Sequence, residues 1–174
     1  VDKSMSHITH NEIFLKNGLN CIYLKIKIKA YEIKEFLCLA KEIGFSGFSI
    51  TMPYKNHVCR YVKSDLDCVN TVFLKSNTWH GYNSDGKGAI KALLQKSSIT
   101  DKIIVVLGAG GTARAIIKEL LLHNPGDIFV INRTEQKARA LEDLFDISVI
   151  DEGKLKDINY DILINATCCG MLGV

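Results

Sequence analysis

The sequence predicts an α/β fold, and three observations support that prediction. Residues 103–107 and 127–131 are short apolar runs rich in β-branched side chains, which is typical of strands buried on both faces of a parallel sheet. The first run passes through a glycine-rich turn into residues 113–122, whose apolar positions follow helical spacing. Upstream, an alternating segment, 21–29, precedes a second helical pattern. We therefore expect an N-terminal β-α-β domain followed by a strand–turn–helix domain with a parallel sheet.

The turn after residue 107 has the composition of a phosphate-binding turn. It reads G-x-G-x-x-A and includes Gly108, Gly110, Gly111, Thr112 and Ala113. Gly108 allows a tight turn, Gly110 lets the backbone approach a ligand, and Ala113 lets helix and strand pack closely. The helix that follows offers free N–H groups and the positive end of its dipole. This context predicts a Rossmann-type dinucleotide-binding domain.

The next strand indicates which dinucleotide binds. Residues 127–131 end in Asn132, Arg133 and Thr134, where an NAD site normally carries an acidic residue. Arg133 can stack on adenine and meet a 2′-phosphate, and the Thr134 hydroxyl can donate a hydrogen bond. A solvated loop arginine is the alternative interpretation. The position relative to the glycine turn favours NADP.

Composition excludes several other classes of protein. The 174 residues are 47% hydrophobic and 24% charged with a net charge of +3, as in an ordinary globular protein. The lysines are scattered, so no nucleic-acid partner is expected, and no apolar run is long enough for a membrane partner. No signal peptide is recognised. The six cysteines lack C-x-x-C pairs and metal-ligand spacing, which predicts reduced thiols, no metal and a cytoplasmic location.

Ser4 and Ser6, near the N-terminus, are two residues apart. In an extended chain this spacing puts both hydroxyls on one side of the backbone, where they could hold a carboxylate, although loop or cap residues are the simpler alternative. A helix is expected from about residues 10–11 to Asn17, with Gly18 as its C-terminal stop.

The rest of the first domain is predicted from its periodicity. Residues 21–29 alternate apolar and polar side chains, which predicts a half-exposed strand. Residues 33–43 follow helical spacing and end at Gly44, and residues 48–51 form a short strand. Residues 69–72 and 79–82 are expected to pair as a hairpin around Ser76 and Asn77.

Lys55 and Asp85 are the candidate acid–base residues. Lys55 lies in T-M-P-Y-K, where Pro53 is expected near the first position of a helix, so the dipole there disfavours the positive charge of Lys55. A lysine so placed can donate or accept a proton. Asp85 precedes a helix expected over residues 87–96. The alternatives are a surface lysine and a helix-capping aspartate.

Seven short motifs together resemble the shikimate dehydrogenase family, including the dehydrogenase part of dehydroquinase–shikimate dehydrogenase fusions. They occur in the family's order: S-x-S then H-N (4–11), T-M-P-Y-K (51–55), V-N-T-V (69–72), G-Y-N-S-D-G (81–86), G-A-G-G-T-A-R-A (108–115), N-R-T (132–134) and N-A-T-C-C-G-M (165–171). Each motif alone is weak, whereas seven in order are specific.

The resemblance implies a role for each matched residue. It implies reversible reduction of 3-dehydroshikimate to shikimate by NADPH, in aromatic amino acid biosynthesis. Lys55 and Asp85 would be the catalytic pair. The substrate would be held by Ser4, Ser6, Thr51 and Asn70. The cofactor would be held by the glycine turn, by Asn132, Arg133 and Thr134, and by the loop containing Asn165, Ala166, Thr167 and Met171.

The chain also departs from the family pattern. His7 replaces a proline, Ser84 replaces a threonine, and the segment 63–68 is several residues shorter. The family's first strand and its region beyond residue 174 are outside the chain, so the Rossmann-type part is expected to have four strands. We expect a substrate domain at 1–84, a linking helix at 85–100 and a partial NADP-binding domain at 101–174. A quinate dehydrogenase and a non-catalytic binding module remain alternatives.

Overall fold

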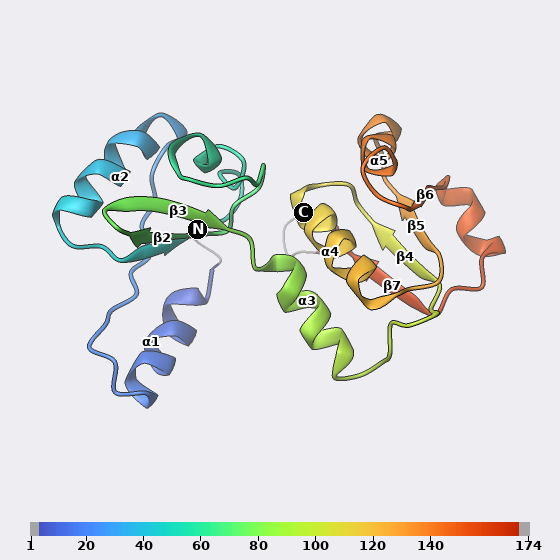
Figure 1. Ribbon diagram of the computed structural model, residues 1–174, viewed down its shortest axis with the longest axis horizontal. Coiled ribbons are helices and arrows are strands. Elements are labelled where there is room, and N and C mark those ends of the chain that lie inside the picture. Colours follow the sequence, from blue (N-terminus) through green and yellow to red (C-terminus); the bar gives the residue numbers. More distant parts are fainter. Residues whose placement is uncertain (1–3, 171–174) are drawn as a thin grey trace.

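The computed structural model describes residues 4–170. The chain forms two lobes, and the end of strand β3 (Thr78–Tyr82) leads directly into helix α3 (Asp85–Leu94), which lies between them (Figure 1). This arrangement confirms the predicted α/β class, with a mixed first lobe and a second lobe built on a parallel sheet.

The first lobe is built on a three-stranded antiparallel sheet in the order β1-β2-β3. Strand β1 (Gly47–Ser49) pairs with β2 (Thr71–Lys75), which pairs with β3. Three helical elements precede β1 in this lobe, and a fourth lies between β1 and β2. They are α1 (Ser6–Lys16), η1 (Ala30–Glu32), α2 (Ile33–Glu42) and η2 (Val58–Tyr61).

The hairpin predicted between β2 and β3 is confirmed. Its turn is formed by Ser76 and Asn77, with φ angles of 47° and 61°. Two consecutive residues with positive φ are the signature of a type I′ turn, whose twist matches that of the two strands. The hairpin carries the chain from residue 70 back to residue 82, so the two ends of this strand pair lie together. Asn70 N–H donates to the Tyr82 carbonyl at 3.1 Å across that end.

Helix α2 and the sheet bury the core of the first lobe. Ile33, Leu37 and Ala40 are at most 4% exposed and pack with Val72 and Trp79. Burying an aliphatic side chain of this size contributes on the order of 2 kcal/mol. The Trp79 indole N–H donates to the Leu37 carbonyl at 2.9 Å, so its polar atom is satisfied inside the core. The predicted helix over residues 33–43 is therefore confirmed, and Gly44 follows it with φ +88°.

The strand expected over residues 21–29 is absent. This segment has no regular secondary structure, and most side chains on both of its sides are exposed, including Ile22 at 74% and Leu24 at 53%. Alternating apolar and polar residues indicate an extended chain with one apolar side, but a strand also needs a neighbouring strand to bond to. Here the Tyr23 backbone bonds to the Asn11 side chain instead, at 2.7 Å through its N–H and 3.0 Å through its carbonyl.

Two helix predictions in this lobe also need correction. Helix α1 begins at Ser6, four residues earlier than expected, while Gly18 (φ +63°) follows its end as expected. After Pro53 there is no α-helix: the chain makes turns and then the short 3₁₀ helix η2. The helix-dipole argument for Lys55 therefore does not apply, and the position of Lys55 has another cause, described below.

The second lobe is a parallel sheet in the order β6-β5-β4-β7. Its strands are β4 (Ile104–Leu107), β5 (Ile128–Ile131), β6 (Ser148–Val149) and β7 (Ile162–Asn165). The chain moves to one side of β4 for β5 and β6 and to the other side for β7. The four strands predicted from the sequence are confirmed. The reversal at β4 is the topological switch point at which doubly wound folds bind ligands.

Helices cover this sheet and complete a second core. Helix α4 (Gly111–Leu120) follows β4, helix α5 (Glu135–Glu142) follows β5, and the short η3 (Leu121–His123) and η4 (Glu152–Asp157) lie in the connections. Ile104, Val106 and Ile117 are fully buried or nearly so. This core includes Ile90 of α3 and shares none of its buried residues with the first core. We propose that α3 belongs physically with the second lobe.

Helices α3 and α4 pack side by side (Figure 1). At Gly86 an added Cβ would lie 2.2 Å from the Ala115 carbonyl oxygen. The contact is therefore backbone against backbone, and a side chain at position 86 would separate the helices.

Among the described helices, none is long and apolar enough to cross a membrane.

This packing predicts that Gly86→Ala destabilises the protein by about 1–3 kcal/mol, as overpacking does. Gly88→Ala is the matched control, because it lies in the same helix and an added Cβ meets nothing within 4 Å. Removing a glycine from an exposed helical position stabilises by roughly 0.5–1 kcal/mol. Urea unfolding of the three proteins measures both changes. Equal effects of the two substitutions would refute the proposed close packing.

Candidate active site

The glycine turn lies at the carboxyl edge of the parallel sheet. Gly108 follows β4 with φ +107°, and its N–H donates to the Ile131 carbonyl at 2.8 Å. An added Cβ at Gly108 would lie 3.1 Å from the Thr167 methyl group and 3.2 Å from the Ala166 carbonyl carbon. The turn is therefore fixed between the ends of β5 and β7, and glycine is needed there for both conformation and space.

Gly110 differs, because it faces open space. It is the N-cap of α4, and an added Cβ there meets nothing within 4 Å. Packing inside the protein therefore does not require glycine at this position, whereas close approach of a ligand would. The first N–H groups of α4, from Gly111, Thr112 and Ala113, lack carbonyl partners in a preceding helical turn. The arrangement is suited to an anion such as a pyrophosphate.

Asn132, Arg133 and Thr134 follow β5 at the same edge of the sheet. The Asn132 amide donates to the Thr134 carbonyl at 2.7 Å, which closes the turn into α5. Arg133 is exposed and makes no ion pair with any residue in the described range 4–170. Its guanidinium remains available to a ligand at this edge.

The loop after β7 reaches the edge from the other side of β4. The Ala166 N–H donates to the Leu107 carbonyl at 2.8 Å, and the Asn165 side chain accepts from the Thr167 N–H at 3.0 Å and hydroxyl at 2.6 Å. Three of the four predicted loop residues therefore lie beside the glycine turn. The fourth, Met171, is outside the described residues.

Lys55 and Asp85 form an ion pair at the junction of the two lobes. The distance from Lys55 Nζ to Asp85 Oδ2 is 2.6 Å, and each side chain is 19% exposed. These residues are thirty positions apart in the sequence, and the fold brings their side chains into contact. Partial burial leaves the pair accessible to a small ligand while strengthening its interaction relative to a solvated pair.

Backbone hydrogen bonds hold Lys55 in place instead of a helix. The Val69 N–H donates to the Lys55 carbonyl at 2.8 Å, and the Ile50 N–H donates to the Asn70 carbonyl at 2.7 Å. The turn after β1 is thus bound to the chain entering β2. Thr51, predicted as a substrate ligand, begins this turn and is exposed, and its carbonyl accepts from the Tyr54 N–H at 3.0 Å.

Asn70 holds the carboxylate half of the pair. Its side-chain N–H₂ donates to Asp85 Oδ1 at 2.6 Å. Its side-chain oxygen, Oδ1, accepts from the Ser84 N–H at 3.0 Å and from the Thr71 hydroxyl at 2.8 Å. The sequence predicted Asn70 as a substrate ligand. The structure gives it a set of internal contacts that orient the Asp85 carboxylate.

Ser4 and Ser6 are brought together, but by a helix start and not by an extended chain. The Ser4 hydroxyl donates to the Ser6 hydroxyl at 3.1 Å and accepts from the Ser6 N–H at 3.3 Å. The Ser6 carbonyl also contacts the side chains of Thr9 and His10 in α1. Among residues 4–170, neither serine side chain is bonded to Lys55, Asn70 or Asp85.

Three contacts around Asp85 and the start of α4 were not expected from the sequence. Asp85 Oδ2 also accepts a hydrogen bond from the Thr112 hydroxyl at 3.3 Å. An ion pair joins Arg114 to Asp67. The thiol of Cys68, which is 5% exposed, lies against Gly111, where an added Cβ would be 2.4 Å from the sulfur. These contacts join residues of different motifs, so no local pattern contains them.

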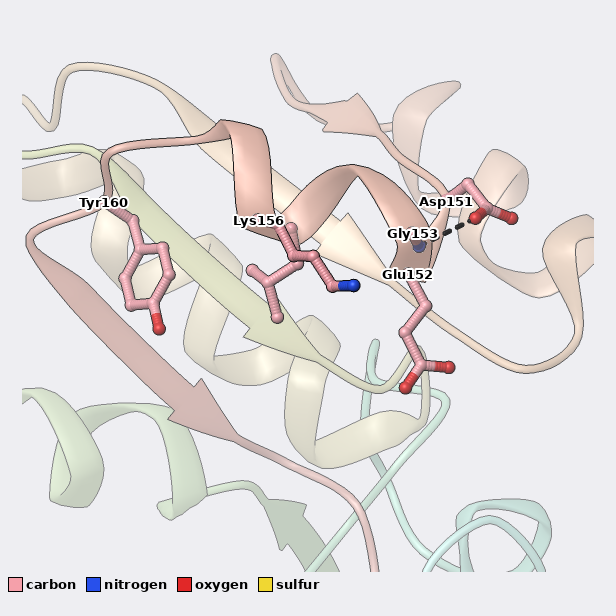
Figure 2. Close-up of a pocket in the computed structure, with 6 residues that line it drawn as sticks. Asp151, Glu152, Gly153, Lys156 and Tyr160 are labelled. Carbon is pink, nitrogen blue, oxygen red and sulfur yellow. Dashed lines mark hydrogen bonds between the residues drawn. The ribbon is translucent and has the colours of Figure 1, made fainter.

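A separate hollow of about 750 Å³ lies away from this cluster. Figure 2 shows its labelled residues, Asp151, Glu152, Gly153, Lys156 and Tyr160, along the connection between β6 and β7. All of its lining residues come from that one connection, and it includes none of the predicted site residues. No group of three or more potential metal ligands occurs among residues 4–170.

Comparison with known proteins identifies the family. The model described as shikimate dehydrogenase substrate binding domain matches residues 1–72, and the model described as shikimate / quinate 5-dehydrogenase matches residues 91–170. The chain belongs to the shikimate dehydrogenase family. The NADP⁺-dependent shikimate dehydrogenase of Methanocaldococcus jannaschii is 38% identical over 98% of this chain and 66% of its own length.

Solved structures of the family share the fold. A shikimate dehydrogenase in complex with NADP⁺ is 35% identical, with a TM-score of 0.88 over 99% of this chain and 65% of its own. The Thermus thermophilus enzyme in complex with shikimate is 27% identical, with a TM-score of 0.87 over 98% of this chain and 66% of its own. The chain spans 64–66% of the length of five curated shikimate dehydrogenases that it matches.

The environment of Cys68 predicts its reactivity. Burial raises the pKa of this thiol, so little of the nucleophilic thiolate is present near neutral pH. We expect iodoacetamide to modify the exposed Cys21 and Cys38 well before Cys68, and all three at similar rates in urea. Peptide mass spectrometry over a time course measures this order. Early labelling of Cys68 in the folded protein would contradict its position against Gly111.

Proposed function

We propose that the protein catalyses reversible, NADP-dependent reduction of 3-dehydroshikimate to shikimate. The observation that carries the proposal is the 2.6 Å contact of Lys55 with Asp85, next to the glycine turn through Thr112. A proton donor and a dinucleotide-binding turn therefore adjoin each other, as reduction of a ketone requires. The relatives that bind NADP⁺ or shikimate support the same substrate and cofactor.

The residues at the sheet edge fit NADP. The open face of Gly110 and the N–H groups that begin α4 suit the pyrophosphate, and the exposed Arg133 suits a 2′-phosphate. Asn165, Ala166 and Thr167 lie across β4 from Arg133, so they would flank the other end of an extended dinucleotide. When bound, NADPH supplies the hydride.

Lys55 would supply the proton. As the carbonyl carbon accepts the hydride, its oxygen becomes an alkoxide, and transfer of one proton from the Lys55 ammonium yields the alcohol and a neutral amine. Asp85 would hold the ammonium in position and balance its charge, and Asn70 would fix the plane of the carboxylate. In the reverse direction the amine accepts the proton from the shikimate hydroxyl.

The remaining site residues would bind substrate polar groups. The hydroxyls of Ser4 and Ser6, which lie 3.1 Å apart, would share the carboxylate of shikimate. Thr51 would contact a ring hydroxyl. A cytoplasmic location follows from the same proposal, because exposed thiols such as Cys21 and Cys38 persist in a reducing compartment.

The central test is a double-mutant cycle on the acid–base pair. In the full-length native polypeptide that carries these residues, Lys55→Met should lower turnover roughly 100-fold or more, as loss of a general acid does. Asp85→Asn should also lower turnover, and the double variant should be little worse than the worse single variant. Steady-state NADPH formation with shikimate measures all four proteins.

Normal turnover of Lys55→Met with near-normal shikimate affinity would overturn the proposed mechanism. The matched control is Lys87→Met, which removes an exposed lysine of α3 whose ammonium lies over the ring of Tyr82. Faster turnover with quinate than with shikimate would favour the quinate alternative. Ligand binding without turnover in the unsubstituted protein would favour a non-catalytic binding module.

Arg133→Ala tests the cofactor. Loss of a charge-assisted contact with phosphate should weaken NADP⁺ binding by about 2 kcal/mol, roughly 30-fold, and should change NAD⁺ binding much less. Calorimetric titration with both cofactors measures the difference. Arg60→Ala, which removes another exposed arginine from the first lobe, controls for net charge. Equal weakening of both cofactors by Arg133→Ala would show that this arginine does not recognise the phosphate.

A further inference from the structure

The hydroxyl of Thr112 is directed at the catalytic carboxylate. Thr112 is the second residue of α4, directly after the glycine turn, and its Oγ1 lies 3.3 Å from Asp85 Oδ2. This is the same oxygen that Lys55 Nζ contacts at 2.6 Å. We propose that Thr112 is a positioning residue that holds Asp85 against Lys55 and so connects the cofactor turn to the proton donor. The inference rests on the proposed function.

The two polar groups of Thr112 face different tasks. Its backbone N–H belongs to the first turn of α4 and has no helical carbonyl partner, so it is available to a phosphate. A threonine hydroxyl has a single proton to donate. In this structure the hydroxyl donates its hydrogen bond to Asp85, so the side chain serves the acid–base pair while the backbone N–H is left for the cofactor.

Neighbouring contacts on both sides fix the Thr112–Asp85 geometry. Gly86, which follows Asp85, lies against the Ala115 carbonyl, and Gly111, which precedes Thr112, lies against the Cys68 thiol. Close packing of this kind leaves little room for either helix end to shift. The hydroxyl and the carboxylate are therefore held at hydrogen-bond distance by the backbones that carry them.

The donors on Asp85 come from both lobes. Lys55 and Asn70 belong to the first lobe, whereas Thr112 is the donor from the glycine turn. A carboxylate with donors on both oxygens has a defined plane, which keeps Oδ2 directed at the ammonium. Loss of the Thr112 hydroxyl should loosen that plane without removing either catalytic group.

Thr112→Val and Thr112→Ser separate the hydroxyl from the shape of the side chain. In the full-length polypeptide, Thr112→Val should lower turnover about 3- to 10-fold, the loss expected for one hydrogen bond of ordinary net strength. The dissociation constant for NADP⁺, measured by calorimetry, should stay within about twofold, since the backbone N–H remains. Thr112→Ser keeps the hydroxyl and should recover most of the lost turnover.

A double variant shows whether Thr112 acts through Asp85. Thr112→Val combined with Asp85→Asn should turn over no more slowly than Asp85→Asn alone. Additive losses, wild-type turnover in Thr112→Val, weakened NADP⁺ binding or failure of Thr112→Ser to recover turnover would each overturn the inference.

A second readout does not depend on activity. Thermal unfolding of the same four proteins of the cycle reports the contact itself: non-additive shifts in Tm support it, and additive shifts overturn it. If the unsubstituted protein fails to oxidise shikimate, the proposed function fails, yet the unfolding cycle still decides whether Thr112 and Asp85 are coupled.

Discussion

The close packing of α3 on α4 is the constraint on which the rest of the site depends. It places the first residue of α3, Asp85, beside the second residue of α4, Thr112, although they come from different motifs. The approach of the two helices requires a hydrogen atom in place of a side chain at Gly86, and the approach of Cys68 to the start of α4 requires the same at Gly111. Glycines in these motifs thus have two distinct physical tasks: Gly110 leaves space for a ligand, while Gly86 and Gly111 leave space for the protein itself.

This constraint explains why the proposed acid–base pair adjoins the glycine turn. Lys55 comes from an irregular turn of the first lobe, which is held by backbone bonds to the chain entering β2. Asp85 comes from a helix whose core residue, Ile90, is packed in the second lobe. The ion pair therefore spans two hydrophobic cores, and Asn70 aligns its carboxylate from the side of the first lobe.

The sequence predicted the second lobe better than the first. Buried parallel strands such as β4 and β5 have a strong local signature, because both faces are apolar and a glycine turn follows β4. Residues 21–29 had an equally clear alternation, but a strand also needs a partner, and alternation contains no information about one. Pro53 misled in a similar way: proline is compatible with the first turn of a helix and with a turn, and the following residues form only a 3₁₀ segment.

For the site, the sequence predicted residues that the fold brings close together, while their roles toward ligands stay predictions. Gly108, Arg133 and Asn165 lie at one edge of the sheet as their motifs require. Asn70 and Thr112 were expected to bind ligands, yet their side chains bond to Asp85. These contacts join residues that lie 15 and 27 positions apart and come from different motifs, so no single motif could predict them.

The separation of the two hydrophobic cores has a consequence for how such a protein can change over evolutionary time. Because the cores share no buried residue, substitutions near Thr51 or the serine pair need not disturb the packing beneath the glycine turn. The residues where α3 meets its neighbours have no such freedom. Asp85 bonds to Lys55 and Thr112, Gly86 lies against Ala115, and Gly111 lies against Cys68. We therefore expect substitutions to be tolerated most readily in the first lobe and least readily where α3 contacts α4.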